Sequence, residues 1–171
     1  LGFDFDGKNG LAVSFFMAFC VVGLGEELCK YIVLVLYALR KPSFNEPFDG
    51  IVYAVMISLG FAALENVFYV SDGGVGVAFA RMFTAVPMHA AFAVLMGYQV
   101  GLAKFMNQSV RTNVSLKGLF LAVFFHGAYD FVLFQDSSVL LTLLVFPIMI
   151  WAFVLSRKAM RLHSKNSPFS K

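Results

Sequence analysis

Two adjacent glutamates, Glu26 and Glu27, lie within an apolar stretch that is otherwise typical of a membrane-spanning helix. Two histidines, His89 and His126, lie at similar depth in two other apolar stretches. A carboxylate in hydrocarbon is costly unless it is paired, protonated or facing a water-filled cavity. A single polar site that contains all four groups is therefore a better explanation than four unrelated polar groups in the membrane. Such a site suits hydrolysis, in which an acidic side chain takes a proton from water.

The first motif is Glu26-Glu27-Leu28-Cys29-Lys30. Glu26 and Lys30 are spaced i, i+4 and share one helical face, with the glutamate in the favourable leading position. Glu27 points about 100° away around the helix. We predict that one carboxylate is the general base and that Lys30 orients or neutralises the other. The alternative is an ion pair that only fixes helix packing, for which a single glutamate would suffice.

Glu65 and Asn66 form a second candidate group. Glu65 has no basic residue within one turn of its own helix, so we expect its partner to come from another element. Small neighbours (Gly60, Ala62 and Ala63) would let another helix approach closely. We assign Glu65 to the catalytic cluster and Asn66 to its supporting residues. The alternative is a protonated Glu65 bonded to a backbone carbonyl.

Two histidines complete the predicted cluster. His89 follows Pro87, and a proline within a span bends the helix and often accompanies a cavity. His126 and Asp130 are again spaced i, i+4. Asp130 is therefore placed to accept a hydrogen bond from one imidazole nitrogen and fix the tautomer that the other presents. The alternative is that both histidines only satisfy hydrogen bonds within the bundle.

The predicted site has more negative than positive groups, because it combines four carboxyl groups with one lysine: Glu26, Glu27, Glu65, Asp130 and Lys30. Such an excess cannot stay dry and fully ionised. Either some carboxyl groups are protonated or a divalent cation shares them. Glu65, His89 and His126 would make a three-ligand zinc site with an open position for water. The residues alone leave both versions open.

The composition places this chain in a membrane. Of its 171 residues, 60% are hydrophobic and 13% are charged, and the mean hydropathy is +0.80. We therefore predict an all-α, polytopic transmembrane bundle, because this exceeds what a soluble core can bury. The whole chain, 1–171, is expected to form one domain with a polar tail over about 157–171. Apolar runs of bilayer-spanning length predict five helices, at about 11–39, 48–70, 78–105, 117–135 and 139–156.

Basic residues predict the orientation of these spans. An amino end outside and a carboxyl end in the cytoplasm put ten of the thirteen on the cytoplasmic side, in agreement with the positive-inside rule: Arg40, Lys41, Lys104, Arg111, Lys117, Arg157, Lys158, Arg161, Lys165 and Lys171. Only Lys8 and Arg81 fall outside, and Lys30 lies within a span. The first residue is Leu1 rather than Met, so we expect a processed or truncated chain with further spans upstream.

Other hydrolase signatures are missing from the sequence. There is no Gly-x-Ser-x-Gly motif and no His-Glu-x-x-His motif. Two rival functions remain open. A proton- or cation-coupled transporter would use the carboxylates as a relay, although five spans without a repeated half argue against the common carrier folds. A catalytically silent scaffold would use the polar cluster only to specify packing.

Taken in order, these motifs resemble the PrsW family of bacterial intramembrane proteases, which is related to the CAAX-prenyl protease superfamily. The matching features cover about residues 20–135: Glu26-Glu27-x-x-Lys30, Phe48-Asp49-Gly50-Ile51-Val52-Tyr53, Gly60-Phe61-Ala62-Ala63-Leu64-Glu65-Asn66, His89, and His126-x-x-x-Asp130. By this resemblance, Glu26 and Glu27 match an essential glutamate pair, and His126 matches a late-helix histidine.

The resemblance implies a multi-pass endopeptidase in the bacterial plasma membrane, surrounded by lipid, with no nucleic-acid partner. Its substrate would be a single-pass membrane protein, for instance an anti-sigma factor in a stress response. Two positions depart from the wider CAAX-type pattern. Glu65 replaces a histidine, and Asp130 replaces an asparagine. An ionised Asp130 would repel a developing oxyanion, which argues against a direct oxyanion-hole role.

Overall fold

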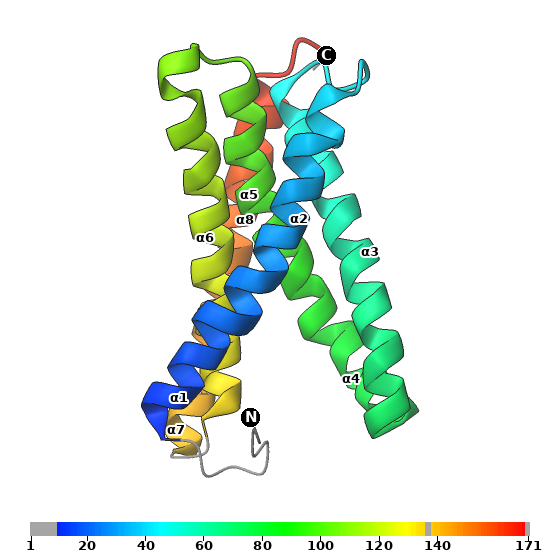
Figure 1. The fold of residues 1–171 in the computed structure, drawn as a ribbon, viewed down its shortest axis with the longest axis vertical. Coiled ribbons are helices and arrows are strands. Elements are labelled where there is room, and N and C mark those ends of the chain that lie inside the picture. Colours follow the sequence, from blue (N-terminus) through cyan, green and yellow to red (C-terminus); the bar gives the residue numbers. More distant parts are fainter. Residues whose placement is uncertain (1–9, 136–137, 170–171) are drawn as a thin grey trace.

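The computed structural model describes residues 10–135 and 138–169, and within them all regular secondary structure is helical (Figure 1). The first span is α1 (Leu11–Phe16), the π-helical segment η1 (Met17–Gly23), α2 (Leu24–Leu36) and the short 3-10 turn η2 (Ala38–Arg40). The remaining elements are α3 (Pro47–Gly73), α4 (Val75–Phe83), α5 (Ala85–Lys104), α6 (Gln108–Phe134), α7 (Val139–Thr142) and α8 (Val145–Lys165).

Five helical stretches are long and apolar enough to cross a membrane: Leu11–Arg40, Pro47–Gly73, Ala85–Lys104, Gln108–Phe134 and Val139–Lys165. This confirms the predicted all-α bundle of five spans. The outside-to-cytoplasm orientation stays a prediction. The polar sequence Asp136-Ser137-Ser138 predicts a tight connection between the last two spans, but it lies largely outside the described residues, as does the segment before Gly10.

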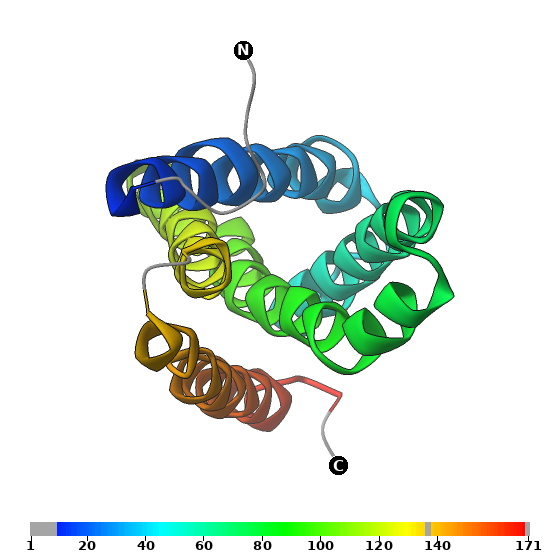
Figure 2. The same ribbon diagram turned by 90° about the horizontal axis from the view of Figure 1, so that it is seen from below.

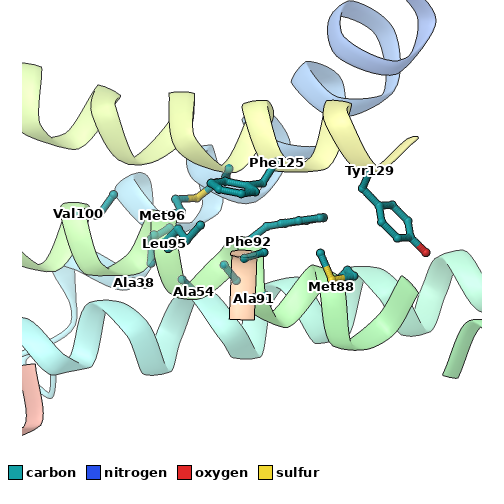
Figure 3. Packing of buried hydrophobic residues seen from close by; sticks show 14 residues of the cluster. Ala38, Ala54, Met88, Ala91, Phe92, Leu95, Met96, Val100, Phe125 and Tyr129 are labelled. Atoms are coloured by element: carbon teal, nitrogen blue, oxygen red, sulfur yellow. The ribbon is translucent and has the colours of Figure 1, made fainter. Parts of the chain in front are cut away.

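Helix α5 is the centre of the bundle, with α3, α6 and α8 packed around it (Figures 1 and 2). Its side chains form half of the buried apolar cluster at the core, including Met88, Phe92 and Met96. Figure 3 shows these residues next to Phe125 and Tyr129 of α6. A central helix buried on all sides explains why His89, also on α5, is 3% exposed.

Helices α3 and α5 approach closely because glycines face each other. A Cβ atom added to Gly50 of α3 would lie 2.6 Å from Gly101 Cα and 2.7 Å from Gly101 N, and Gly97 lies equally near. Small residues at such a crossing allow backbones to pack directly in a membrane, where helix association depends on van der Waals contact. The small-residue spacing Gly97-x-x-x-Gly101 is therefore a packing motif, and it places α5 against α3.

This contact predicts that Gly50→Ala destabilises the bundle. An inserted methyl group that displaces backbone typically costs about 1–3 kcal/mol. Gly60→Ala is the matched control, because Gly60 is exposed in the same helix and a Cβ there meets nothing within 4 Å. Thermal unfolding in detergent should show a lower melting temperature for Gly50→Ala and no loss for Gly60→Ala. Equal melting temperatures would contradict the proposed close packing.

The ends of α3 follow the sequence signals. Pro47 lies in its first turn, and the side chain of Asp49 accepts a 2.9 Å hydrogen bond from the backbone N–H of the N-cap residue Glu46. The sequence Ser71-Asp72-Gly73-Gly74 is typical of a turn, but the helix continues through Gly73 and ends at Gly74, which has a φ of 78°. Glycine adopts that conformation without a steric penalty.

The predicted third helix, 78–105, is wrong as a single element. The structure has two helices, α4 and α5, which are separated at Thr84. Pro87 lies in the first turn of α5, and its ring would clash with the carbonyl four residues earlier, at Phe83, in a continuous helix. The break gives α4 a direction of its own.

Two further boundaries differ from the prediction. The polar segment before 117 is the start of α6, which begins at Gln108, and α8 continues past 156 to Lys165. Polar residues are compatible with a helix that extends beyond the hydrocarbon. In the α8 extension, His163 is buried, with its ring centroid 4.2 Å from that of Tyr98 on α5.

Candidate active site

The two-glutamate motif is held against α6 by a close backbone contact. A Cβ atom added to Gly23, at the end of η1, would lie 3.2 Å from the backbone nitrogen of Gly127. Gly127 directly follows His126, and Glu26 and Glu27 begin one turn after Gly23. The π-helical turns of η1 change the register of the first span just before the glutamates, as π-bulges often do at functional sites.

Glu27 is fully buried and binds two groups through one oxygen. Its Oε1 accepts a 2.6 Å hydrogen bond from Lys30 Nζ and lies 2.8 Å from His126 Nδ1. Lys30 Nζ also lies 3.4 Å from Glu26 Oε2, so the predicted i, i+4 pair is present but longer. Lys30 thus bridges the two carboxylates rather than neutralising one.

His89 on α5 joins the same cluster. Its Nδ1 lies 3.0 Å from Lys30 Nζ, and its Nε2 lies 3.0 Å from Glu65 Oε2. A lysine ammonium is only a donor, so Nδ1 accepts and the Nε2–H donates to the carboxylate. The rings of His89 and His126 are 5.1 Å apart, centroid to centroid. The two histidines from different helices therefore meet.

Glu65 has a partner that the sequence analysis did not identify. Arg81 of α4 lies with Nη2 2.8 Å from Glu65 Oε2, and its Nε donates a 2.8 Å hydrogen bond to Asn66 Oδ1. The guanidinium also lies over the ring of Tyr69, 3.7 Å from the centroid. The expectation that Glu65 needs a partner from another element is met by Arg81 and His89. The available signal was a lone arginine in an apolar run, close along the chain to an unpaired glutamate.

His126 lies between carboxylates on both sides of its ring. Its Nε2 is 3.3 Å from Asp130 Oδ2 and 3.9 Å from Glu26 Oε2. Phe92 of α5 stacks on the ring, with centroids 5.1 Å apart and planes 22° apart. The ring is thus fixed by polar contacts at its edge and by an aromatic side chain on its face.

These groups border a cavity of about 530 Å³. Glu26, Glu65, His89, His126 and Asp130 all line it, whereas Glu27 lies behind them. The rest of the lining is mainly apolar or weakly polar and comes from α1, η1 and α3 to α6: Ser14, Met17, Val22, Tyr69, Arg81, Thr84, Ala85, Met88, Phe92, Tyr129, Leu133 and Phe134. Such a lining suits a substrate segment whose side chains are apolar.

The donor set fits a divalent cation. Glu26, Glu27, His89 and His126 each offer one ligand atom, and these atoms lie within 4.8 Å of one another. Glu27 Oε2 is buried and has no hydrogen-bond partner among the described residues. Two imidazole nitrogens and a carboxylate are a recognised ligand set for catalytic zinc. Glu65 lies outside this group, at the far nitrogen of His89.

The predicted site residues therefore come together, with a different arrangement of the carboxylates. Each histidine has one nitrogen facing the cluster of candidate ligands and the other facing a carboxylate, Glu65 for His89 and Asp130 for His126. Metal-binding histidines usually show this arrangement, because the outer carboxylate fixes the tautomer. Arg81 adds a second positive charge to the one that the sequence analysis counted.

Comparison with known proteins gives a consistent result. A family model described as PrsW family intramembrane metalloprotease matches residues 5–156. Protease PrsW of Bacillus subtilis is 38% identical over 153 residues, which cover 90% of this chain and 70% of that protein. Protease PrsW of Oceanobacillus iheyensis is 38% identical, covering 84% of this chain and 66% of that protein.

Protease PrsW of Geobacillus kaustophilus is 42% identical over 116 residues, which cover 68% of this chain and 51% of that protein. The chain thus spans between about half and 70% of the length of these relatives. No solved structure matches it.

Proposed function

Because this chain belongs to the PrsW family of intramembrane metalloproteases, a family of multi-pass bacterial membrane proteins, we propose that it cleaves a single-pass membrane protein within the bilayer. An anti-sigma factor is the substrate that we propose to test first. The observation that carries the proposal is the buried group of two imidazole nitrogens and one carboxylate, with a further carboxylate behind each histidine.

In this proposal Glu27, His89 and His126 hold a divalent cation such as zinc. From the sequence alone, Glu65 was expected in place of Glu27. The hydrogen bond of Glu65 to His89 Nε2 instead supports an outer position for Glu65, in which it fixes the ring so that Nδ1 faces the cluster. When bound, the cation supplies a Lewis acid that polarises a carbonyl oxygen and makes water more acidic.

Glu26 is proposed as the general base. It borders the cavity, while its neighbour Glu27 is completely buried behind it. A carboxylate at this position takes a proton from water through Oε2 as the oxygen attacks the scissile carbonyl, and then passes the proton to the leaving amine. The i, i+1 spacing therefore gives the two glutamates different roles, because they point in different directions from one helix.

Three further residues orient the proposed ligands and Arg81: Asp130, Glu65 and Asn66. Asp130 accepts a hydrogen bond from His126 Nε2–H and fixes its tautomer. Asn66 and Glu65 hold the guanidinium of Arg81 at the cavity wall. Its positive charge there would offset the negative charge that develops on the attacked carbonyl.

The cavity supports a short, partly unwound segment as substrate. A hydrogen-bonded helix does not expose its amides, so several residues must extend before water can attack one. A volume of about 530 Å³ lies within the usual range for sites that enclose a small ligand or a short stretch of peptide. The cavity is lined by residues of several spans, and α1 diverges from α3 and α4 at one end of the bundle (Figure 1), which is where we propose that a transmembrane partner enters.

The test is cleavage of a tagged single-pass protein by the purified chain in liposomes, before and after treatment with a membrane-permeable chelator. We expect product from the untreated protein, loss of product after chelation and recovery on addition of zinc. Product that persists after complete metal removal would contradict the metal-dependent mechanism. Ion flux without any peptide product would instead support a carrier that uses the carboxylates as a relay.

A further inference from the structure

Lys30 lies where a bound cation would be expected. Its Nζ is 2.6 Å from Glu27 Oε1, 3.0 Å from His89 Nδ1 and 3.4 Å from Glu26 Oε2. These are three of the four side chains that form the candidate ligand group. The lysine side chain is 3% exposed, so bulk water does not compete for its ammonium.

The contacts of this ammonium account for all its hydrogen-bonding capacity. A lysine head group has three N–H donors and no acceptor, and three acceptors surround it here. One positive charge is thus shared among two carboxylates and an imidazole nitrogen. The ammonium thus neutralises the same side chains as a metal ion would, although its hydrogen bonds are longer than metal–ligand bonds.

An ammonium and a metal ion cannot occupy this place together. Zinc binds carboxylate oxygen and imidazole nitrogen at about 2.0–2.2 Å, so an ion bound to Glu27 and His89 would take the space between the same acceptors. Two positive charges at such a distance repel strongly in a buried site. The hydrogen bonds of Lys30 to Glu27 and His89 must therefore break when an ion binds.

We propose that Lys30 is a built-in substitute cation, which holds the ligand side chains together in the metal-free protein and is displaced when a metal ion binds. The inference rests on the proposed metal centre. It gives the spacing of two glutamates and a lysine on one helix a purpose beyond packing, because the same helix supplies both a ligand and the ligand's temporary counter-charge.

The structure also offers a place for the displaced head group. Lys30 Nζ lies 4.6 Å from the centroid of the Phe61 ring on α3, within the range of a cation–π contact. A small rotation of the side chain keeps that contact and the one to Glu26 while it releases Glu27 and His89. Lys30 would thus release Glu27 and His89 while its head group stays beside Phe61 and Glu26.

Zinc affinity tests this displacement. Purified wild type, Lys30→Met, Lys30→Gln and Lys104→Met are compared at one pH by competition with a chromophoric zinc chelator. Lys104 is the matched control, since its Nζ donates to the backbone oxygens of Leu39 and Phe44 and contacts none of the candidate ligands. We expect both Lys30 variants to bind zinc at least tenfold more tightly than wild type, because no ammonium competes, and Lys104→Met to be unchanged.

The other outcomes are distinct. Equal or weaker zinc binding by both Lys30 variants would overturn the displacement and leave the metal centre standing. Absence of zinc binding in wild type and in every variant would withdraw the metal centre, and this inference with it. Zinc binding by the Lys30 variants but not by wild type would also support the displacement, because it would mean that the ammonium fully blocks the ion.

A second measurement needs no variant and remains decisive if the Lys30 variants fail to fold. Structures of the wild-type protein with and without zinc are compared. We expect Lys30 Nζ to lie beyond hydrogen-bond distance of Glu27 Oε1 when zinc is bound. A zinc-loaded structure that retains the contact to Glu27 would overturn the proposal.

Discussion

Glu26→Gln is expected to lower the rate of peptide cleavage about 10²–10⁴-fold, the usual contribution of a positioned general base. The amide has nearly the shape of the carboxylate but cannot take a proton from water. Glu26 lines the cavity and is partly exposed, so its replacement leaves no fully buried group unpaired. Zinc affinity should therefore stay within a few-fold of wild type.

The measurement is a single-turnover cleavage assay in liposomes, run beside zinc titration of the same preparations. Asp72→Asn serves as the matched acid-to-amide control, because Asp72 is exposed near the end of α3 and borders no part of the cavity. It should cleave at the wild-type rate. Wild-type activity in Glu26→Gln would exclude Glu26 as the base, and loss of zinc together with activity would make it a ligand.

Glu27→Gln is expected to abolish cleavage, zinc binding and part of the stability together. Glu27 is completely buried, and its Oε1 contacts both Lys30 and His126. Removing one partner of a buried charged pair typically costs about 3–5 kcal/mol, because the remaining charge has no counter-charge. Loss of an outer hydrogen-bond partner alone weakens metal binding about 10–100-fold, so loss of a ligand should exceed that range.

Thermal unfolding and zinc titration of the purified variant check this expectation. Adding zinc should raise the melting temperature of wild type and of Glu26→Gln but not that of Glu27→Gln. The opposite pattern, with zinc retained in Glu27→Gln, would exchange the roles of the two glutamates. The pair of variants therefore separates proton transfer from metal binding at adjacent positions.

The sequence was sufficient to predict which residues meet but not how they share the site. Apolar length and polar depth predicted five spans and a cluster of Glu26, Glu27, His89 and His126, and the structure brings these four together. The rotation of each helix about its axis cannot be read from spacing alone. For that reason Glu65 was expected among the ligands, whereas the structure places it behind His89.

Arg81 was missed because its position depends on a helix break. A continuous helix over 78–105 would carry Arg81 and His89 along one axis, with no reason for Arg81 to meet Glu65. The break at Thr84 gives α4 a separate course, and the guanidinium then reaches α3. Proline sterics explain the break, but the direction of α4 before it is set by packing against α3 and α5.

The position of the apolar core determines from which end of the bundle water can reach the cavity. Leu34, Ala38, Met96 and Val100 fill the bundle on one side of the glutamates, while the cavity extends the other way toward Tyr69 and Phe134. Water and protons exchanged through this cavity would therefore pass toward that end of the bundle. With the predicted orientation, that end faces the cell exterior, so hydrolysis in this bundle would draw its water from outside.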